Sequence, residues 1–162
     1  PVPASSYGLN VYLEYFGFDL TLFFQGVQGV DIISDLKKET DLWSGLNISN
    51  LNKGTRLLDA WSPTNTDSDI PALSIADNNN EKRVSSYWVE DGSYLKLKNI
   101  QLGYNLPEKA LQKLHMERWR FFVSAQNVFT IHSRSFTGVD PENPNYGYPN
   151  ALNITVGTSL NF

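Results

Sequence analysis

Residues 150–162 constrain the fold of this chain most, because apolar and polar side chains alternate along them. One face collects the apolar residues, interrupted only by Thr158: Leu152, Ile154, Val156, Leu160 and Phe162. The other face holds small uncharged groups: Asn153, Thr155, Gly157, Ser159 and Asn161. Successive side chains of a strand point to opposite sides, so this period predicts a strand with one apolar and one polar face. Such a strand fits a soluble β-sandwich, or the wall of an outer-membrane barrel between lipid and a wet lumen.

Composition narrows the classes of protein that this chain could form. Its 162 residues suffice for one domain, and 41% apolar against 19% charged residues argue against global disorder. A net charge of −4 without a basic stripe argues against nucleic acid, and the lack of cysteine excludes disulfides and thiolate metal sites. No apolar run is long enough for a transmembrane helix, which leaves a barrel open. The opening Pro1–Ala4 carries no signal segment, so any export signal would lie outside the chain.

The same alternation recurs along most of the chain and predicts an all-β fold of antiparallel strands. The predicted strands are about 6–15, 18–29, 93–106, 118–131 and 150–162. Phe16-Gly17 is expected to form a tight reversal. Near Asn127 the alternation slips, which predicts a β-bulge. Pro107 begins a short predicted helix that ends at Leu114.

The connections between these strands differ greatly in length. Residues 30–92 form one long connection, with short helices expected over 34–43, capped by Ser34, and over 55–61. Residues 132–149 form another long connection, whereas 15–18 and 106–117 are short. Counted back from the end, both short connections lie on the side of Phe162 and both long ones lie opposite. Outer-membrane barrels sort short periplasmic turns from long extracellular loops in this way, so the sorting favours the barrel.

Specific motifs then resemble a known family. Residues 85–106 read Ser-Ser-Tyr-Trp-Val-Glu-Asp-Gly-Ser-Tyr-Leu-Lys-Leu-Lys-Asn-Ile-Gln-Leu-Gly-Tyr-Asn-Leu, followed by proline. This stretch closely resembles the C-terminal region of SusC/RagA-type TonB-linked outer-membrane proteins of the Bacteroidetes. Further segments fit the same family: Gly17–Leu20, Phe23–Gly26, Ser124–Thr130, Asp140–Glu142 and Phe162. Ala125 stands where glycine is common in the family, which is a small departure.

The resemblance implies a 22-stranded barrel, plugged by an N-terminal domain and capped by a SusD-like lipoprotein, in the outer membrane of a Gram-negative bacterium. Such a protein imports oligosaccharides or peptides with energy that TonB delivers through the plug. The chain would supply the last five strands, with 30–92 as a partly helical extracellular loop, and would lack the plug and TonB-binding segment. Five strands cannot close in lipid, so the fragment alone would transport nothing and could self-associate. No enzyme activity, catalytic residue or cofactor is predicted.

Aromatic residues are the candidates for binding. Those in or beside the predicted outer loops are Trp43, Trp61, Tyr87, Trp88, Tyr146 and Tyr148. Their flat rings suit sugar faces or a partner protein, and Trp61 and Trp88 are preferred; the alternative is that they pack the loops together. Phe162 resembles the terminal aromatic that barrel-assembly machinery recognises, or it is an ordinary strand end. Rings near strand ends could form membrane-interface girdles: Tyr7, Tyr15, Phe18, Tyr104 and Trp119.

The sequence gives little support for a metal site. Loop acids lack calcium-loop spacing: Asp67, Asp69, Asp77, Asp140 and Glu142. His115 and His132 stand apart, so no zinc site is predicted. The alternatives to a transporter are a soluble β-sandwich that binds carbohydrate through Trp61, Trp88 and Tyr146, or a self-associating structural module.

Overall fold

The structure, a computed structural model, describes residues 2–41, 53–74, 80, 83–144 and 147–162. Trp43 and Tyr146, both predicted binding residues, lie outside these ranges. The chain divides into two compact units, which we describe separately. The sheet unit comprises Val2–Val30, Ser93–Ser133 and Asn150–Phe162, and the loop unit comprises Asp31–Gly92 and Arg134–Pro149. No helix among the described residues has the length and apolar character needed to cross a membrane.

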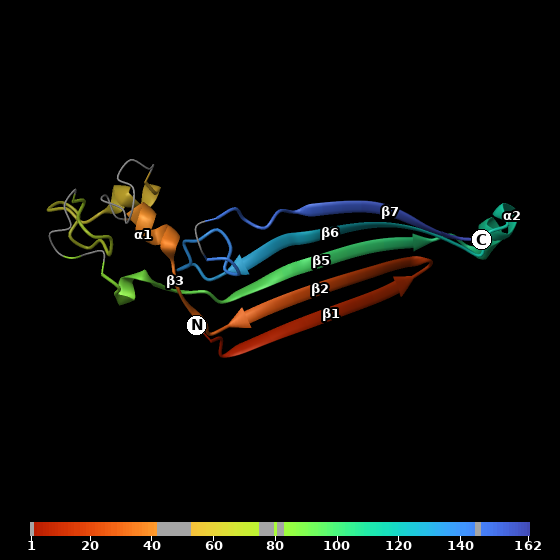
Figure 1. Cartoon of the computed structure of the whole chain (residues 1–162), viewed down its shortest axis with the longest axis horizontal. Helices are drawn as coiled ribbons and strands as arrows, with labels where there is room; N and C mark the ends of the chain where they lie inside the picture. The colour runs from red at the N-terminus through yellow and green to blue at the C-terminus, as the bar shows by residue number, and fades with distance from the viewer. Residues whose placement is uncertain (1, 42–52, 75–79, 81–82, 145–146) are drawn as a thin grey trace. The chain divides into compact units, whose positions relative to one another are not determined.

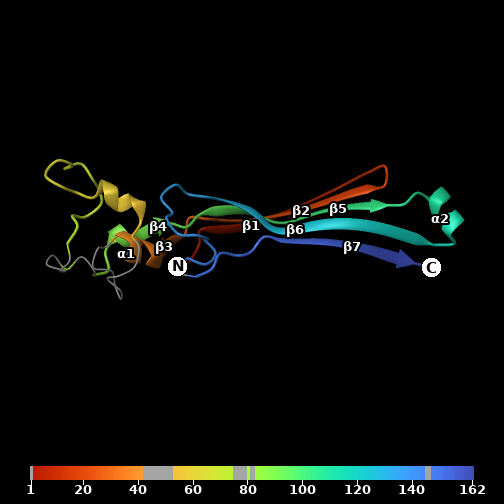
Figure 2. The same cartoon turned by 90° about the horizontal axis from the view of Figure 1, so that it is seen from above.

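The sheet unit is built from five antiparallel strands, and each lies beside the strand that precedes it in the unit (Figure 1). The strands are β1 (Ser5–Tyr15), β2 (Phe18–Gln28), β5 (Tyr94–Asn105), β6 (Arg118–His132) and β7 (Asn153–Asn161). Seen edge on, they form a single layer (Figure 2). Their ends agree with the predicted ranges to within three residues. The prediction of antiparallel up-and-down strands is confirmed, whereas the count of 22 strands stays a prediction.

Because the strands pair in register, the alternating apolar and polar side chains of each strand line up into two continuous faces of the sheet. One row of cross-strand partners reads Leu13, Leu20, Leu102, Val123 and Val156. The next row on the opposite face reads Tyr12, Thr21, Gln101, Ser124 and Thr155. In the apolar row Leu13 is 57% exposed and Val156 is 79% exposed. The sheet therefore has one apolar face and one polar face, and the apolar face is covered by no second layer within the sheet unit.

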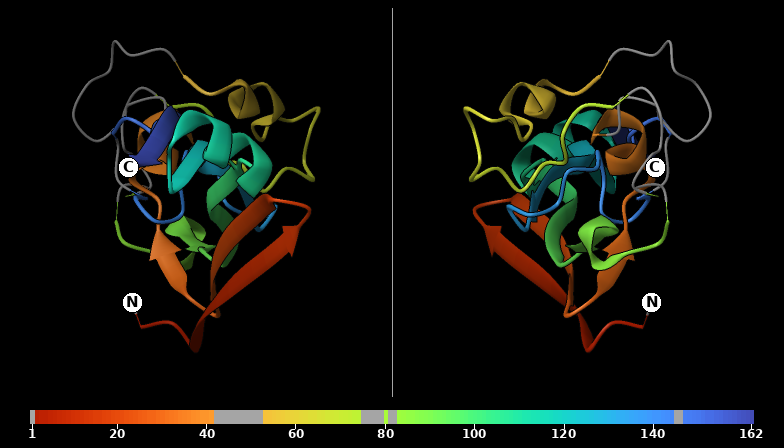
Figure 3. Two further views of the ribbon diagram at one scale, coloured as in Figure 1. Left: turned by 90° about the vertical axis from the view of Figure 1, so that its right-hand side faces the viewer. Right: turned by 90° about the vertical axis from the view of Figure 1, so that its left-hand side faces the viewer.

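The short connections lie at one end of this sheet. Phe16 and Gly17 join β1 to β2 with φ angles of 46° and 82°, as a type I′ hairpin turn requires. The helix α2 (Glu108–Leu114) joins β5 to β6 at the same end, where the C-terminus also lies (Figures 1 and 3). Residues 29–93 and 133–152 leave from the opposite ends of their strands. The predicted sorting of short and long connections is therefore present in the fold.

The predicted bulge lies in β6. Asn99 pairs with Gln126 and Leu97 pairs with Phe129, so two residues of β6 face Lys98 of β5. Asn127, the first of the two, has a φ of 56°, and its side-chain amide donates to the carbonyl of Ala151 at 3.1 Å. The register between β2 and β5 shifts at the same place, because Phe23 pairs with Asn99 and Phe24 with Leu97. Leu97 and Phe129 therefore both lie on the apolar face with Phe24.

The loop unit contains short elements. They are β3 (Asp31–Ile33), α1 (Asp35–Asp41), the 3₁₀ helices η1 (Thr55–Asp59) and η2 (Ser86–Trp88), and β4 (Val89–Asp91). β3 and β4 pair as a two-stranded antiparallel sheet. Both predicted helices are present, the second as a 3₁₀ helix, and Ser34 Oγ accepts the Lys37 amide at 3.1 Å as expected of an N-cap. The β3–β4 pair was not predicted, because three-residue strands carry too little periodicity.

Candidate functional site

The polar face of the sheet carries an ion pair that spans three strands. Arg120 of β6 donates from Nε to Asp19 Oδ1 at 3.1 Å and from Nη2 to Oδ2 at 2.5 Å. Asn105 Nδ2 adds a third hydrogen bond to Oδ1 at 3.2 Å. Asp19 belongs to β2, so the pair crosses the intervening strand β5 at Gly103. A Cβ atom on Gly103 would lie 2.5 Å from Asp19 Oδ1, so only glycine leaves room for this pair.

A shallow depression of about 530 Å³ surrounds the ion pair. Its lining residues are Tyr12, Glu14, Gly17, Asp19, Thr21, Asn105, Arg118 and Arg120. Most of these polar groups already bond to one another: Tyr12 donates its hydroxyl to Glu14 at 3.0 Å, and Arg118 donates to Asn105 at 3.4 Å. The depression is thus a largely self-satisfied polar surface, which suits fixing the strands better than capturing a ligand.

Two glycines of the sheet are covered by aromatic rings. Phe122 projects from the polar face of β6, and its ring occupies the space over Gly157, its cross-strand partner on β7. Tyr7 covers Gly26 on the apolar face in the same way. The Arg120 guanidinium carbon lies 5.5 Å from the centroid of the Phe122 ring. Packing of its ring over Gly157 therefore explains why an apolar residue, Phe122, lies on the polar face.

Aromatic residues gather on the apolar face at the end with the short connections. Tyr15, Phe18, Tyr104 and Phe121 are successive cross-strand partners, and the Phe18 and Tyr104 centroids lie 4.6 Å apart. Trp119 lies 4.9 Å from Phe121 and donates its indole N–H to Thr158 at 2.8 Å. Rings with one polar atom at the edge of an apolar band are typical of a membrane interface. Four of the five predicted girdle residues come together here, and Tyr7 lies at the other end of β1.

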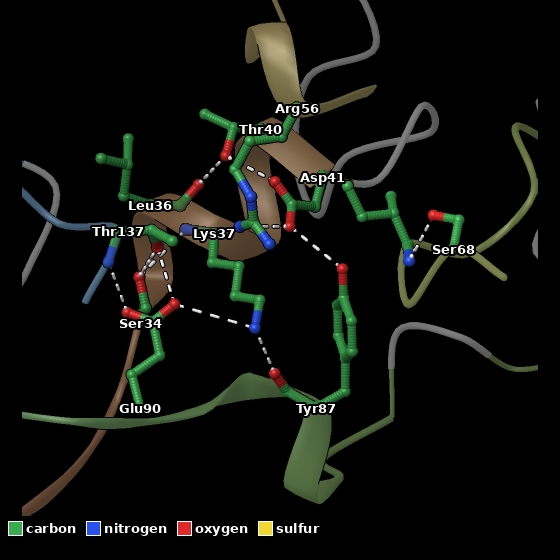
Figure 4. Close-up of polar contacts among 11 residues, drawn as sticks. Ser34, Leu36, Lys37, Thr40, Asp41, Arg56, Ser68, Tyr87, Glu90 and Thr137 are labelled. Atoms are coloured by element: carbon green, nitrogen blue, oxygen red, sulfur yellow. Dashed lines mark hydrogen bonds and ion pairs between the residues drawn. The ribbon is translucent and has the colours of Figure 1, made fainter. Parts of the chain in front are cut away.

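In the loop unit, the buried carboxylate of Glu90 joins three segments (Figure 4). Its oxygens accept hydrogen bonds from the Thr137 amide at 2.9 Å and the Thr137 hydroxyl at 2.7 Å. Lys37 Nζ of α1 lies 3.7 Å from Glu90 Oε1. The contact with Thr137 ties the 30–92 connection to the 132–149 connection, which are far apart in sequence.

A second buried carboxylate, Asp41, anchors the other end of α1 (Figure 4). It accepts from Arg56 Nη1 at 2.8 Å and from the Tyr87 hydroxyl at 3.0 Å. Burial, together with the charge of Asp41, raises the pKa of the Tyr87 hydroxyl. Lys37 Nζ donates to the Tyr87 carbonyl at 2.6 Å and lies 4.2 Å from the centroid of its ring. Buried charges with this many partners hold the segments in one arrangement.

The predicted binding aromatics fall into two groups. Trp88 is only 1% exposed, donates its indole N–H to the Arg83 carbonyl at 3.0 Å, and packs against Tyr87 with centroids 4.8 Å apart. Its indole offers no face to a ligand, so the structure contradicts the preference for Trp88 and supports loop packing there. Trp61 and Tyr148 are 43% and 97% exposed, and their role in binding stays a prediction. Phe162 is exposed beyond the end of β7.

The sequence did not single out the charged residues of the loop network. Lys37, Asp41 and Glu90 lie among other charged and polar residues and look like solvated side chains. Only the N-cap at Ser34 indicated that the helix beside them begins at a fixed place. The network joins positions up to 103 residues apart, as the 3.4 Å contact between the Ser34 and Thr137 hydroxyls shows, and local spacing cannot encode such pairs.

Taken together, these features define a class of protein. A single antiparallel layer has one apolar face, one polar face, an aromatic row at one end and its long connections at the other. Lipid on one side and a wet interior on the other account for this arrangement. The sheet unit is a wall segment of a transmembrane β-barrel.

Comparison with known proteins identifies the family. TonB-dependent receptor P3 of Formosa agariphila is 38% identical over 178 residues, and TonB-dependent receptor P26 of the same organism is 28% identical over 177 residues. Each alignment covers 100% of this chain and 17% of the relative. No family model matches the chain.

Solved structures agree with these relatives. The RagAB peptide importer in its closed-closed and open-open states matches with a TM-score of 0.80 and 27% identity. Each match covers 99% of this chain and 17% of the importer chain. The chain is therefore a barrel segment of a TonB-dependent receptor of the SusC/RagA type, as its motifs predicted. It spans about a sixth of the length of the proteins that it matches.

Proposed function

We propose that the protein containing this chain imports oligosaccharides or peptides across the outer membrane of a Gram-negative bacterium, driven by TonB through a plug domain. The observation that carries this proposal is the 38% identity to a TonB-dependent receptor over the whole chain, combined with the continuous apolar face of the sheet. The RagAB peptide importer shares this part of its fold and supports a two-component importer. A SusD-like lipoprotein is the partner that this similarity suggests.

Within that importer, this chain supplies five strands of a 22-stranded barrel and part of its outer surface. Residues 30–92 and 132–149 form extracellular loops, and the network around Glu90 and Asp41 gives them a fixed shape. Trp61 and Tyr148 are the described aromatics of these two loops that are exposed enough to contact a substrate or the lipoprotein. Phe162 serves as the signal for barrel assembly. The chain on its own does not transport.

The test is uptake by intact cells. A strain lacking the gene should lose energy-dependent uptake of one class of labelled oligosaccharide or peptide, and the restored gene should return it. Collapse of the proton gradient should stop uptake in the restored strain, because TonB works from that gradient. Unchanged uptake of every oligosaccharide and peptide tested, with the protein found in the soluble fraction, would overturn the proposal in favour of a soluble or self-associating module.

A further inference from the structure

The loop unit is assembled from two segments that are distant in sequence. The first loop, Asp31–Gly92, lies between β2 and β5, and the second loop, Arg134–Pro149, lies between β6 and β7. Residues 93–133, which separate the two loops in sequence, belong to the sheet unit. Any direct connection between the two loops therefore depends on non-covalent contacts.

Thr137 of the second loop makes such contacts with the first loop (Figure 4). Its amide donates to Glu90 Oε2 at 2.9 Å, and its hydroxyl donates to Glu90 Oε1 at 2.7 Å. Because the hydroxyl proton of Thr137 is used in this way, Ser34 Oγ, 3.4 Å away, is the donor to the Thr137 hydroxyl oxygen. We call Ser34, Glu90 and Thr137 the loop junction.

The loop junction is buried on the side of the first loop. Ser34 is fully buried, and Glu90 is only 3% exposed. Water therefore replaces Thr137 at these groups only when the loop unit opens. A hydrogen bond to a charged group favours the bonded state by about ten- to a hundredfold, and Glu90 accepts two from Thr137. The joined arrangement of the two loops is thus strongly favoured.

The part of the first loop that Thr137 contacts is itself held together. The Ser34 amide donates to the Trp88 carbonyl at 3.1 Å, and β3 pairs with β4. Lys37 Nζ of α1 donates to the Tyr87 carbonyl at 2.6 Å. A displacement of Thr137 would therefore be transmitted to α1 and β4 together, since both belong to the same bonded frame.

We infer that the two loops stay joined at the loop junction throughout import and move as one body. This inference rests on the proposed import function and specifies how the outer loops move during it. Among the described residues, the chain passes between the two units after Val30, Gly92, Ser133 and Pro149. Movement of the loops relative to the barrel wall takes place at these positions, because packed contacts within a unit do not deform gradually.

The first experiment asks whether a substitution in one loop loosens the other. Thr137→Val keeps the shape of the side chain and removes the hydroxyl that donates to Glu90. On intact cells, trypsin should cleave the full-length receptor about tenfold faster after Arg83 of the first loop, and faster by the same factor after Arg134 of the second. Val139→Thr is the matched control, because it makes the reverse change at a residue of the second loop that is 57% exposed. Acceleration restricted to the site after Arg134 would overturn the inference.

A second variant keeps this test decisive where Thr137→Val disturbs folding. Glu90→Gln lies in the first loop, keeps the shape of the side chain and removes the charge that the Thr137 hydrogen bonds depend on. Cleavage after Arg83 and after Arg134 should again rise by one common factor. The amount of each variant in the outer membrane is measured alongside. Wild-type cleavage rates at both sites in both variants would also overturn the inference.

The second experiment asks whether the loops stay joined while the receptor imports. The hydroxyl oxygens of Ser34 and Thr137 are 3.4 Å apart and the chain has no cysteine, so Ser34→Cys with Thr137→Cys brings two new thiols within reach of a disulfide. Any cysteine elsewhere in the full-length receptor is replaced first, and mass spectrometry identifies the linked peptide. Cells are given a fluorescein-labelled peptide mixture or glycan digest, whichever the wild type imports. Uptake should be equal before and after reduction of the disulfide, whereas uptake that oxidation stops and reduction restores would overturn the inference.

The outcomes separate this inference from the proposed function. Wild-type import combined with unequal trypsin factors, or with a disulfide that blocks uptake, overturns the joined movement of the loops while the import function stands. Wild-type cells that import neither probe refute the proposed function itself. The trypsin rates at the two sites then still decide whether the loops are joined, because that measurement needs no transport.

Discussion

Arg120 on β6 reaches over Gly103 on β5 to bond both carboxylate oxygens of Asp19 on β2. The two charged residues are 101 positions apart in sequence, yet they fix the mutual register of three strands. A slip of one residue would turn every side chain of a strand to the other face, and would also break this pair. The ion pair and Gly103 beneath it therefore act together to fix the register of the three strands.

The glycine is the first element to test. We expect Gly103→Ala to force the ion pair apart and to destabilise the folded receptor by about 1–3 kcal/mol, as overpacking does. The measurement is the temperature at which the purified receptor loses its compact migration on unboiled gels. Gly147→Ala is the matched control, because among the described residues its added Cβ would meet Asn143 Nδ2 alone, at 3.8 Å. Equal melting of the two variants would contradict the packing role of Gly103.

Substitutions of the two residues of the ion pair should have non-additive effects on the stability of the receptor. Arg120→Ala leaves the Asp19 carboxylate with only the hydrogen bond from Asn105, and losing hydrogen bonds to a charged group costs about 1.5–3 kcal/mol. Removing both charges in the double variant Asp19→Ala with Arg120→Ala should cost less than the sum of the single changes. The same melting assay on all three variants measures the coupling. Strictly additive losses would show that the two residues stabilise the sheet independently.

The Glu90 network should control the order of the loop unit. Glu90→Ala removes the acceptor of two Thr137 hydrogen bonds and the counter-charge of Lys37, so we expect faster cleavage of residues 30–92 by added protease. Asp35→Asn is the control, since the Asp35 side chain is 50% exposed in its 3.2 Å pair with Lys38. Such surface pairs contribute little. Equal cleavage rates in both variants would refute a stabilising network.

The two described loop tryptophans should respond differently to truncation. Trp88→Ala empties a fully buried site, which costs about 3–5 kcal/mol and should expose the loop unit to protease. Trp61→Ala should leave protease resistance intact and lower uptake only if Trp61 contacts substrate or lipoprotein. Limited proteolysis and uptake measured on the same cells separate these effects. Protease resistance of Trp88→Ala equal to that of the wild type would contradict its packing role.

Sequence patterns predicted the sheet well because each strand carries its own period. The alternation ending at Phe162 placed β7, and the slip at Asn127 placed the bulge. The motif of residues 85–106 predicted the family. Strand periodicity and family motifs both depend on residues that are close in sequence. The strands, the bulge and the family could therefore be predicted from the sequence alone.

The polar sites were harder to predict because they depend on distant partners. Nothing near Asp19 indicates that Arg120 lies within bonding distance, and nothing near Glu90 indicates Thr137. Trp88 was preferred as a binding residue from its type and position, but only packing against Tyr87 and Arg83 decides its burial.

The central claim is that the apolar face of the sheet meets lipid and the polar face meets the barrel interior. Neighbouring residues of β7 test it most directly: Val156→Cys lies on the apolar face and Thr155→Cys on the polar face. Each variant of the full-length receptor is labelled with a small fluorophore and reconstituted with brominated lipid, which quenches fluorescence on contact. We predict strong quenching at position 156 and little at position 155. Equal quenching at both positions, or stronger quenching at 155, would contradict the claim.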